Sequence, residues 1–164
     1  MLNENKQPDL SKQQIDSVLA LFSNNQLDEA LDKVNSLIEK YPNESLLFNI
    51  AGACYAGLRQ FDTAVEFYEK AIIVNPDYAK AHYNLAGAYH ELDQFDEALK
   101  SYQDSIKIDS DYAEAHNNLG NLFEELGQLD EAISSYKKAI ALNPNYLESH
   151  YSLSLIFQNL RQFE

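Results

Sequence analysis

The sequence predicts an all-α protein in which antiparallel helix pairs stack into an α-solenoid. The first observation is an internal period of 34 residues, which is kept by Ala30, Ala64, Ala98 and Ala132. The second is the spacing of apolar residues within each period, which follows one face of a helix. A period of this length is typical of arrays whose units bury their apolar faces against one another.

Other columns of similar residues keep the same register. Prolines recur at 42, 76 and 144, with Ser110 in the remaining place, and small residues recur at Gly52, Ala86 and Gly120. Aromatic residues recur in two columns: Tyr55, Tyr89, Phe123 and Phe157, and Tyr68, Tyr102 and Tyr136. The predicted organisation is a flexible segment at 1–10, repeats at 11–44, 45–78, 79–112 and 113–146, and the first helix of a truncated fifth repeat at 147–164.

Each repeat contains two helical stripes separated by a turn. In the fourth repeat Leu119 and Phe123 are spaced i and i+4, and Ala132 and Tyr136 repeat that spacing further on. Gly127 lies between the two stripes, where a glycine is typical of a helix end. A helix–turn–helix unit is therefore expected in every repeat.

Several short segments resemble the tetratricopeptide repeat family. They are NLAGAY at 84–89, NLGNLF at 118–123 and DEAI at 130–133, and the resemblance covers nearly everything after Leu10. It implies a right-handed superhelix whose first helices line a concave face. The first repeat departs from the pattern, with Val18, Val34 and Leu37 in columns that are elsewhere small or aromatic, so we expect it to act as a cap.

Composition limits the partners and the compartment. A net charge of −14 repels phosphate backbones and anionic lipids, so neither nucleic acid nor a membrane is an expected partner. Cys54 is the only cysteine, and the polar N-terminus lacks the pattern of a signal peptide. A cytoplasmic protein is expected, and similar arrays occur especially in bacteria.

The resemblance places a peptide-binding groove on the first helices. It assigns the groove to the second, fifth, sixth, ninth, twelfth and thirteenth positions of each repeat, which are expected to be exposed. The predicted site residues are Asn49, Lys80, Tyr83, Asn84, Gly87, His90, Glu91, Glu114, Asn117, Asn118, Asn121, Glu124, Glu125, Tyr151 and Ser152.

Two features of this groove bear on its partner. Asn84 and Asn118 are equivalent, and the pair resembles the asparagine ladder of O-linked N-acetylglucosamine transferase repeats, which grips a peptide backbone; the alternative is that both are ordinary polar residues. The carboxylate clamp of other family members is missing, because the fifth positions hold no basic residue: Ile15, Asn49, Tyr83, Asn117 and Tyr151. The groove is acidic, so a neutral or basic protein or peptide is the expected partner.

No catalytic residue, metal site or cofactor is predicted. His82, His116 and His150 form a column, but adjacent repeats lie about 10 Å apart, too far for two imidazoles to share a zinc ion. These histidines are expected to fill a bulky packing position, and Cys54 a small buried one. Acidic pairs such as Asp130 and Glu131 fit the start of a helix.

The sequence therefore predicts a protein–protein interaction scaffold without an active site. One alternative is the substrate-recognition arm of a larger glycosyltransferase or sulfotransferase, with a catalytic domain after residue 164. Another is a structural array that self-associates through its truncated C-terminal helix, where Leu153, Phe157 and Leu160 are expected to lie exposed or to pair with another copy.

Overall fold

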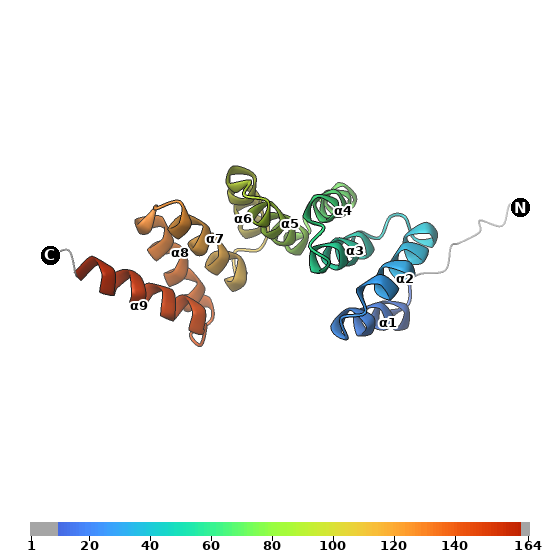
Figure 1. The fold of residues 1–164 in the computed structure, drawn as a ribbon, viewed down its shortest axis with the longest axis horizontal. Coiled ribbons are helices and arrows are strands. Elements are labelled where there is room, and N and C mark those ends of the chain that lie inside the picture. Colours follow the sequence, from blue (N-terminus) through green and yellow to red (C-terminus); the bar gives the residue numbers. More distant parts are fainter. Residues whose placement is uncertain (1–9, 162–164) are drawn as a thin grey trace, which may run out of the picture.

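A computed structural model describes residues 10–161, and this part of the chain folds into nine α-helices (Figure 1). They are α1 (Lys12–Ser23), α2 (Leu27–Lys40), α3 (Ser45–Gly57), α4 (Phe61–Val74), α5 (Ala79–Glu91), α6 (Phe95–Ile108), α7 (Ala113–Glu125), α8 (Leu129–Leu142) and α9 (Leu147–Arg161). Within this range no helix has the length and apolar character needed to cross a membrane. The predicted segment 1–10, except Leu10, lies outside the described residues, as do 162–164 of the fifth repeat.

The helices form consecutive antiparallel pairs that stack in a row. Each pair falls within one 34-residue range, and every helix packs on the next one along the chain. Figure 1 shows the pairs following one another from the blue N-terminal end to the red C-terminal end. We call α1, α3, α5, α7 and α9 the first helices, and α2, α4, α6 and α8 the second helices. The fold class is the all-α solenoid that the sequence predicts.

The turn inside each pair repeats one backbone conformation. Asn25, Arg59, Asp93 and Gly127, which are 34 residues apart, all have positive φ values, of 59°, 59°, 57° and 73°. The next residue is a glutamine whose N–H reaches back to the preceding helix; for example, Gln94 N–H donates to Tyr89 O at 2.9 Å. This six-to-one hydrogen bond is a Schellman motif. The sequence predicted this helix end at Gly127, whereas Arg59 and Asp93 hold the left-handed conformation without a glycine.

A tyrosine ring packed on a glycine joins the two helices of a pair. A Cβ atom added to Gly52 would lie 2.7 Å from Tyr68 Cδ1, and one added to Gly120 would lie 2.7 Å from Tyr136 Cδ1. Both rings are at most 3% exposed. The small and aromatic columns of the sequence therefore meet in the folded protein. In the first repeat, the buried aliphatic side chains of Val18 and Val34 belong to a shared cluster instead.

Each histidine of the column contacts a backbone carbonyl in the turn that precedes its helix. His82 Nε2 lies 2.9 Å from Pro76 O, His116 Nε2 lies 3.1 Å from Ser110 O, and His150 Nε2 lies 3.0 Å from Pro144 O. Each imidazole reaches the carbonyl six residues before it. The column was expected to supply bulky packing, but its shared feature is this polar contact, and His150 is exposed.

The ring-on-glycine contact predicts opposite effects on stability when Gly120 of α7 and Gly87 of α5 are replaced by alanine. Gly120→Ala should lower the free energy of unfolding by about 1–3 kcal/mol, because the new methyl group overlaps the Tyr136 ring. Gly87→Ala is the matched control, since its Cβ atom would have the Tyr102 hydroxyl as its nearest neighbour, at 3.9 Å. Alanine there should stabilise helix α5 by about 0.5–1 kcal/mol. Urea unfolding followed by circular dichroism measures both changes; equal loss of stability would contradict the packing.

His116 predicts a pH-dependent component of stability. Burial lowers the pKa of His116 below its usual value of 6.5, against the opposing effect of the hydrogen bond to Ser110. The unfolded chain then binds this proton more readily, so the contribution is complete above pH 6.5 and decreases as the pH falls through that value. His116→Phe should remove this component of the slope, whereas His150→Phe should leave it in place. Urea midpoints measured between about pH 8 and about pH 5 test this; parallel pH profiles for wild type and His116→Phe would refute it.

Candidate functional site on the inner surface of the first helices

The structure divides the predicted site residues into three groups by exposure. The exposed ones are Lys80, Glu91, Glu114, Asn121, Glu124, Glu125 and Tyr151, and the half-buried ones are Tyr83, Asn84, Gly87, His90, Asn118 and Ser152. Asn49 and Asn117 are only 4% and 1% exposed. Their predicted exposure is therefore corrected: both side chains lie in the contact between successive first helices.

A series of hydrogen bonds explains why these two residues are buried. Asn84 Nδ2 donates to Asn49 Oδ1 at 2.9 Å, which joins α5 to α3. Ser149 Oγ donates to Asn117 Oδ1 at 2.7 Å, which joins α9 to α7. In both contacts a side chain of one first helix donates to an asparagine of the preceding one. The sequence did not single out Ser149, which is fully buried.

Asn118, the second asparagine of the predicted ladder, also makes a hydrogen bond within the protein. Asn118 Nδ2 donates to the Tyr83 hydroxyl at 2.9 Å, which joins α7 to α5. The Tyr83 ring packs on Tyr112, with a centroid distance of 4.9 Å. Burial and then the nearby Glu114 carboxylate raise the pKa of Tyr83. The asparagine N–H groups expected to hold a peptide backbone thus connect neighbouring repeats.

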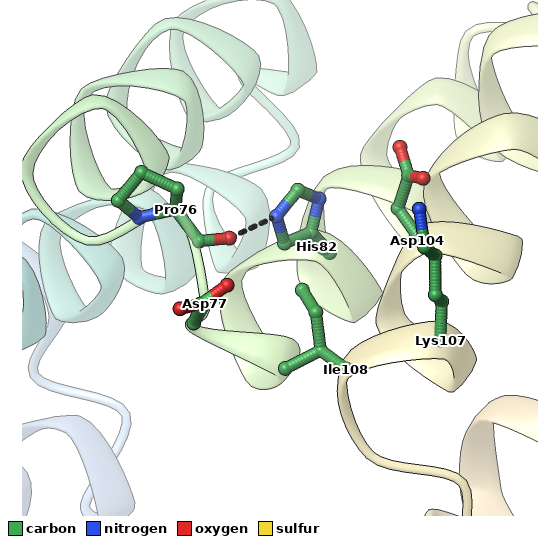
Figure 2. Close-up of a pocket in the computed structure, with 6 residues that line it drawn as sticks. All are labelled: Pro76, Asp77, His82, Asp104, Lys107 and Ile108. Carbon is green, nitrogen blue, oxygen red and sulfur yellow. Dashed lines mark hydrogen bonds between the residues drawn. The ribbon is translucent and has the colours of Figure 1, made fainter.

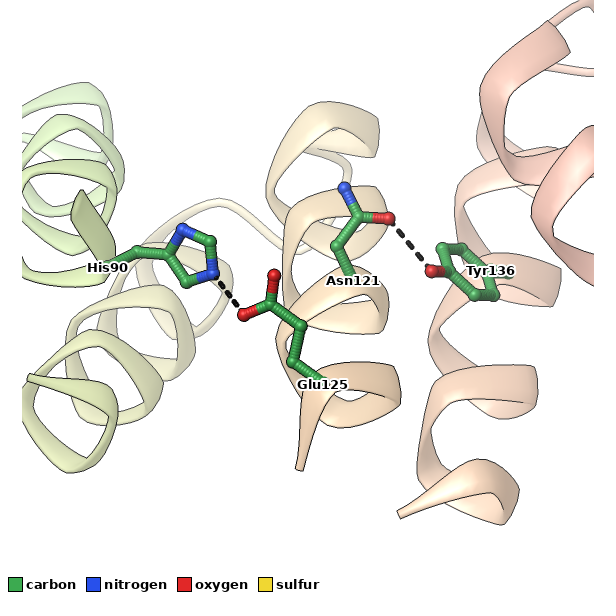
Figure 3. Close-up of polar contacts among 4 residues, drawn as sticks. All are labelled: His90, Asn121, Glu125 and Tyr136. Carbon is green, nitrogen blue, oxygen red and sulfur yellow. Dashed lines mark hydrogen bonds and ion pairs between the residues drawn. The ribbon is translucent and has the colours of Figure 1, made fainter. Parts of the chain in front are cut away.

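The C-terminal ends of α5 and α7 carry a second set of polar contacts (Figure 3). His90 Nε2 lies 2.7 Å from Glu125 Oε2, which links α5 to α7. The Tyr136 hydroxyl of α8 lies 2.8 Å from Asn121 Oδ1. It also lies 2.8 Å from Glu124 Oε2. Burial is the main cause of the raised pKa of Tyr136. The phenol stays protonated at neutral pH and acts as a hydrogen-bond donor.

The polar side chains of α7 lie along one stripe of the helix, on which Asn118, Asn121 and Glu125 also make the internal contacts described above. Glu114, Asn118, Asn121 and Glu125 are spaced i, i+4, i+7 and i+11, so they share one face of the helix. Glu148 on α9 and Glu91 on α5 are also exposed. Glu91 lies 3.6 Å from the exposed Arg59, a contact that solvent weakens. The inner surface is consequently polar and acidic, with Lys80 the basic residue among the predicted site positions.

This surface suits binding, and its chemistry is that of hydrogen bonds and charge. Burial raises the pKa of the Cys54 thiol to about 11, so at neutral pH it remains protonated and a poor nucleophile. Among residues 10–161, no group of three or more histidine, cysteine, aspartate or glutamate side chains is arranged to hold a metal ion. The acidic pairs, such as Asp130 and Glu131, lie in the first turns of second helices.

Similar proteins share the repeat and the fold. Two curated relatives are peroxisomal targeting signal receptors: that of Candida glabrata is 29% identical over 68 residues, and that of Kluyveromyces lactis is 31% identical over 65 residues. These matches cover 42% and 40% of this chain and 12% of each receptor. The chain thus matches only a small part of these much longer relatives.

Solved structures resemble the whole solenoid. MamA 41-end from Desulfovibrio magneticus RS-1 has a TM-score of 0.79 at 22% identity, covering 95% of this chain and 87% of that chain. The first tetratricopeptide repeat domain of Spaghetti (RPAP3), bound to HSP90 peptide SRMEEVD, has a TM-score of 0.69 at 26% identity. It covers 72% of this chain and 94% of that chain. The likeness to MamA concerns the fold alone.

Family models match the central repeats directly. A tetratricopeptide repeat model matches residues 113–146, and a second model of the same repeat matches 55–93 and 88–127. Together they extend over more than half of the 164-residue chain. With the paired helices, the 34-residue period and the ring-on-glycine packing, these matches establish that the chain belongs to the tetratricopeptide repeat family.

Proposed function

We propose that this chain is a protein-interaction scaffold whose inner surface binds an extended segment of another protein. The exposed stripe of α7 carries the proposal. Glu114, Asn121 and Glu125 are exposed on it, whereas Ala115, Leu119 and Leu122 of the same helix are buried. The cross-repeat hydrogen bonds fix α5, α7 and α9 relative to one another, so a partner meets a preorganised surface.

The relatives support this kind of function. The RPAP3 domain was solved with a bound HSP90 peptide, and the curated relatives are receptors for a targeting signal. Both cases point to recognition of a protein segment by a tetratricopeptide surface. Because the chain covers 12% of the Candida glabrata receptor, this similarity supports the binding mode, while the identity of the partner is a separate question.

The charge of the inner surface favours a neutral or basic partner. The peptide bound to RPAP3 contains the acidic run EEVD. In this chain the fifth positions of the repeats are not basic, and Glu91, Glu114 and Glu148 are exposed. An acidic peptide would therefore be repelled, and attraction to a basic one should weaken as salt shortens the Debye length to about 8 Å at physiological strength.

Neutralising this surface provides the test. Linear peptides selected from a random display library on the wild-type chain should carry net positive charge. In fluorescence anisotropy, Glu114→Gln with Glu148→Gln should weaken their binding about tenfold, or about 1.4 kcal/mol, by removing two facing carboxylates. Glu66→Gln with Glu131→Gln, at two exposed positions on the second helices α4 and α8, removes the same charge and is the matched control. Selection of acidic peptides, or equal affinity for the double variant and the control, would reject the proposed surface.

Self-assembly is a second candidate, favoured by one observation on α9. Leu155, Phe157 and Leu160 are 36%, 44% and 45% exposed. Leu153, which was expected to join them, is instead buried and packs with Tyr136. Pairing of these exposed side chains between copies would bury apolar surface. The transferase-arm alternative, the cytoplasmic location and the bacterial source remain predictions.

Sedimentation velocity separates this candidate from the first. If α9 mediates self-association, the average mass of the wild-type chain should rise with concentration, and Phe157→Asp with Leu160→Asp should return it to the monomer value. Leu129→Asp, at an exposed apolar position on α8, is the control for the introduced charge. A constant monomer mass for the wild type would exclude assembly through α9.

A further inference from the structure

A groove on the other side of the solenoid lies where α4, α5 and α6 meet. Its more apolar cavity, which we call the main cavity, has a volume of about 430 Å³ and is lined by Glu69, Ile72, Ile73, His82, Leu85, Tyr89, Glu97, Lys100, Ser101 and Asp104. An adjoining cavity of about 670 Å³ shares His82 and Asp104 with it (Figure 2). Figure 2 shows His82 between Pro76 and Asp77 on one side and Asp104 and Lys107 on the other. We call the two cavities together the outer groove.

The outer groove has an apolar floor with one strongly exposed side chain. Leu85 and Tyr89 of α5 form part of the lining, beside Ile72 and Ile73 of α4. Ile73 is 78% exposed. A partner that covered this side chain and entered the cavity beside it would bury exposed apolar surface, and exposed apolar patches of this kind often mark interaction sites.

Carboxylates line the same cavity. The Tyr89 hydroxyl donates to Glu69 Oε1 at 3.1 Å. Burial, followed by the charges of Glu69 and Glu97, raises the pKa of Tyr89 to about 12. Both carboxylates therefore act on the same phenol. Asp104 adds a third negative charge to the main cavity, against the single positive charge of Lys100.

The next repeat has a cavity that can be compared with the main cavity of the outer groove. A cavity of about 530 Å³ between α6 and α8 is lined by Gln103, Ile106, Lys107, His116, Leu119, Ser134, Ser135 and Lys138. The residues 34 positions later differ: Gln103 is equivalent to Glu69, Lys107 to Ile73 and Lys138 to Asp104. The next repeat thus keeps a cavity at the equivalent place and a carboxylate, Glu131, in the place of Glu97, but it lacks the other two carboxylates and the exposed isoleucine.

We propose that the outer groove is a second docking site, for an amphipathic protein segment in which a large apolar side chain is flanked by lysine or arginine. The apolar side chain covers Ile73 and enters the cavity over Leu85 and Tyr89. The flanking cations meet Glu69 and Glu97, which the apolar floor leaves partly desolvated once the segment is bound. This site does not depend on the inner surface, so one chain can hold two partners, or two segments of one partner, on opposite sides.

The test uses a defined probe. It is a fluorescein-labelled amphipathic peptide of leucine, lysine and serine, and its twin replaces every lysine with glutamate. Fluorescence anisotropy and backbone-amide NMR shifts are measured on the full 164-residue chain. We expect the lysine peptide to bind at least tenfold more tightly than its twin, and to shift the amides of Ile73, Leu85 and Tyr89.

The variants that test the outer groove are chosen by comparison with the equivalent positions of the next repeat. Ile73→Lys installs the residue that the equivalent position 107 carries, on an exposed side chain, so folding should be preserved. It should weaken binding of the lysine peptide at least tenfold, and Glu69→Gln with Glu97→Gln should do so several-fold. Gln103→Ala with Glu131→Gln, the changes at the two positions 34 residues after Glu69 and Glu97, should have no effect.

The inner surface is tested separately. Glu114→Gln with Glu148→Gln should leave binding at the outer groove unchanged even if it abolishes binding at the inner surface. The proposal is overturned if the glutamate peptide binds equally well, if Ile73→Lys has no effect, or if the shifts map to α7 and leave the amides of Ile73, Leu85 and Tyr89 unchanged. It is also overturned if the wild-type chain self-associates and Ile73→Lys abolishes this, because the occupant would then be a second copy.

Discussion

The structure depends on the burial of each helix pair by its neighbours. Its helices are 12 to 15 residues long, a length at which an isolated helix is marginal in water. Stability must come from the contacts that one helix makes with the next, as in other repeat proteins. In the α3–α4 and α7–α8 pairs, a glycine in the first helix allows a tyrosine from the second helix to lie directly on its backbone. This contact sets how closely the two helices approach.

The same stacking divides the polar groups of the first helices between two tasks. Asn49 and Asn117 are buried and accept hydrogen bonds from the next first helix, so their polarity serves the connection between repeats. Glu114, Asn121 and Glu125 lie on the exposed stripe of α7, one or two turns away. Polarity alone therefore does not distinguish the proposed binding residues from the residues that connect repeats.

This division marks how far the sequence could predict the structure. Periodicity indicated every helix pair and the turn at Gly127, because those features follow from local spacing and backbone preference. The left-handed conformation of Arg59 has no such local signature; it is imposed by the geometry of the pair. The burial of Asn117 depends on Ser149, which is 32 residues away, and the histidine contacts depend on the path of the turn. The outer groove was missed because three helices create it.

Equivalent positions in a repeat protein experience nearly the same backbone surroundings, and this makes differences between repeats informative. Where packing controls a position, the residues agree, as in the tyrosines at 68, 102 and 136. Where packing does not determine the residue at a position, that residue is free to differ between repeats and to serve binding. The change from Ile73 to Lys107 and from Asp104 to Lys138 occurs at positions that line a cavity in both repeats. Stability alone does not require an exposed isoleucine beside three carboxylates, and recognition of a basic amphipathic segment gives this combination a physical purpose.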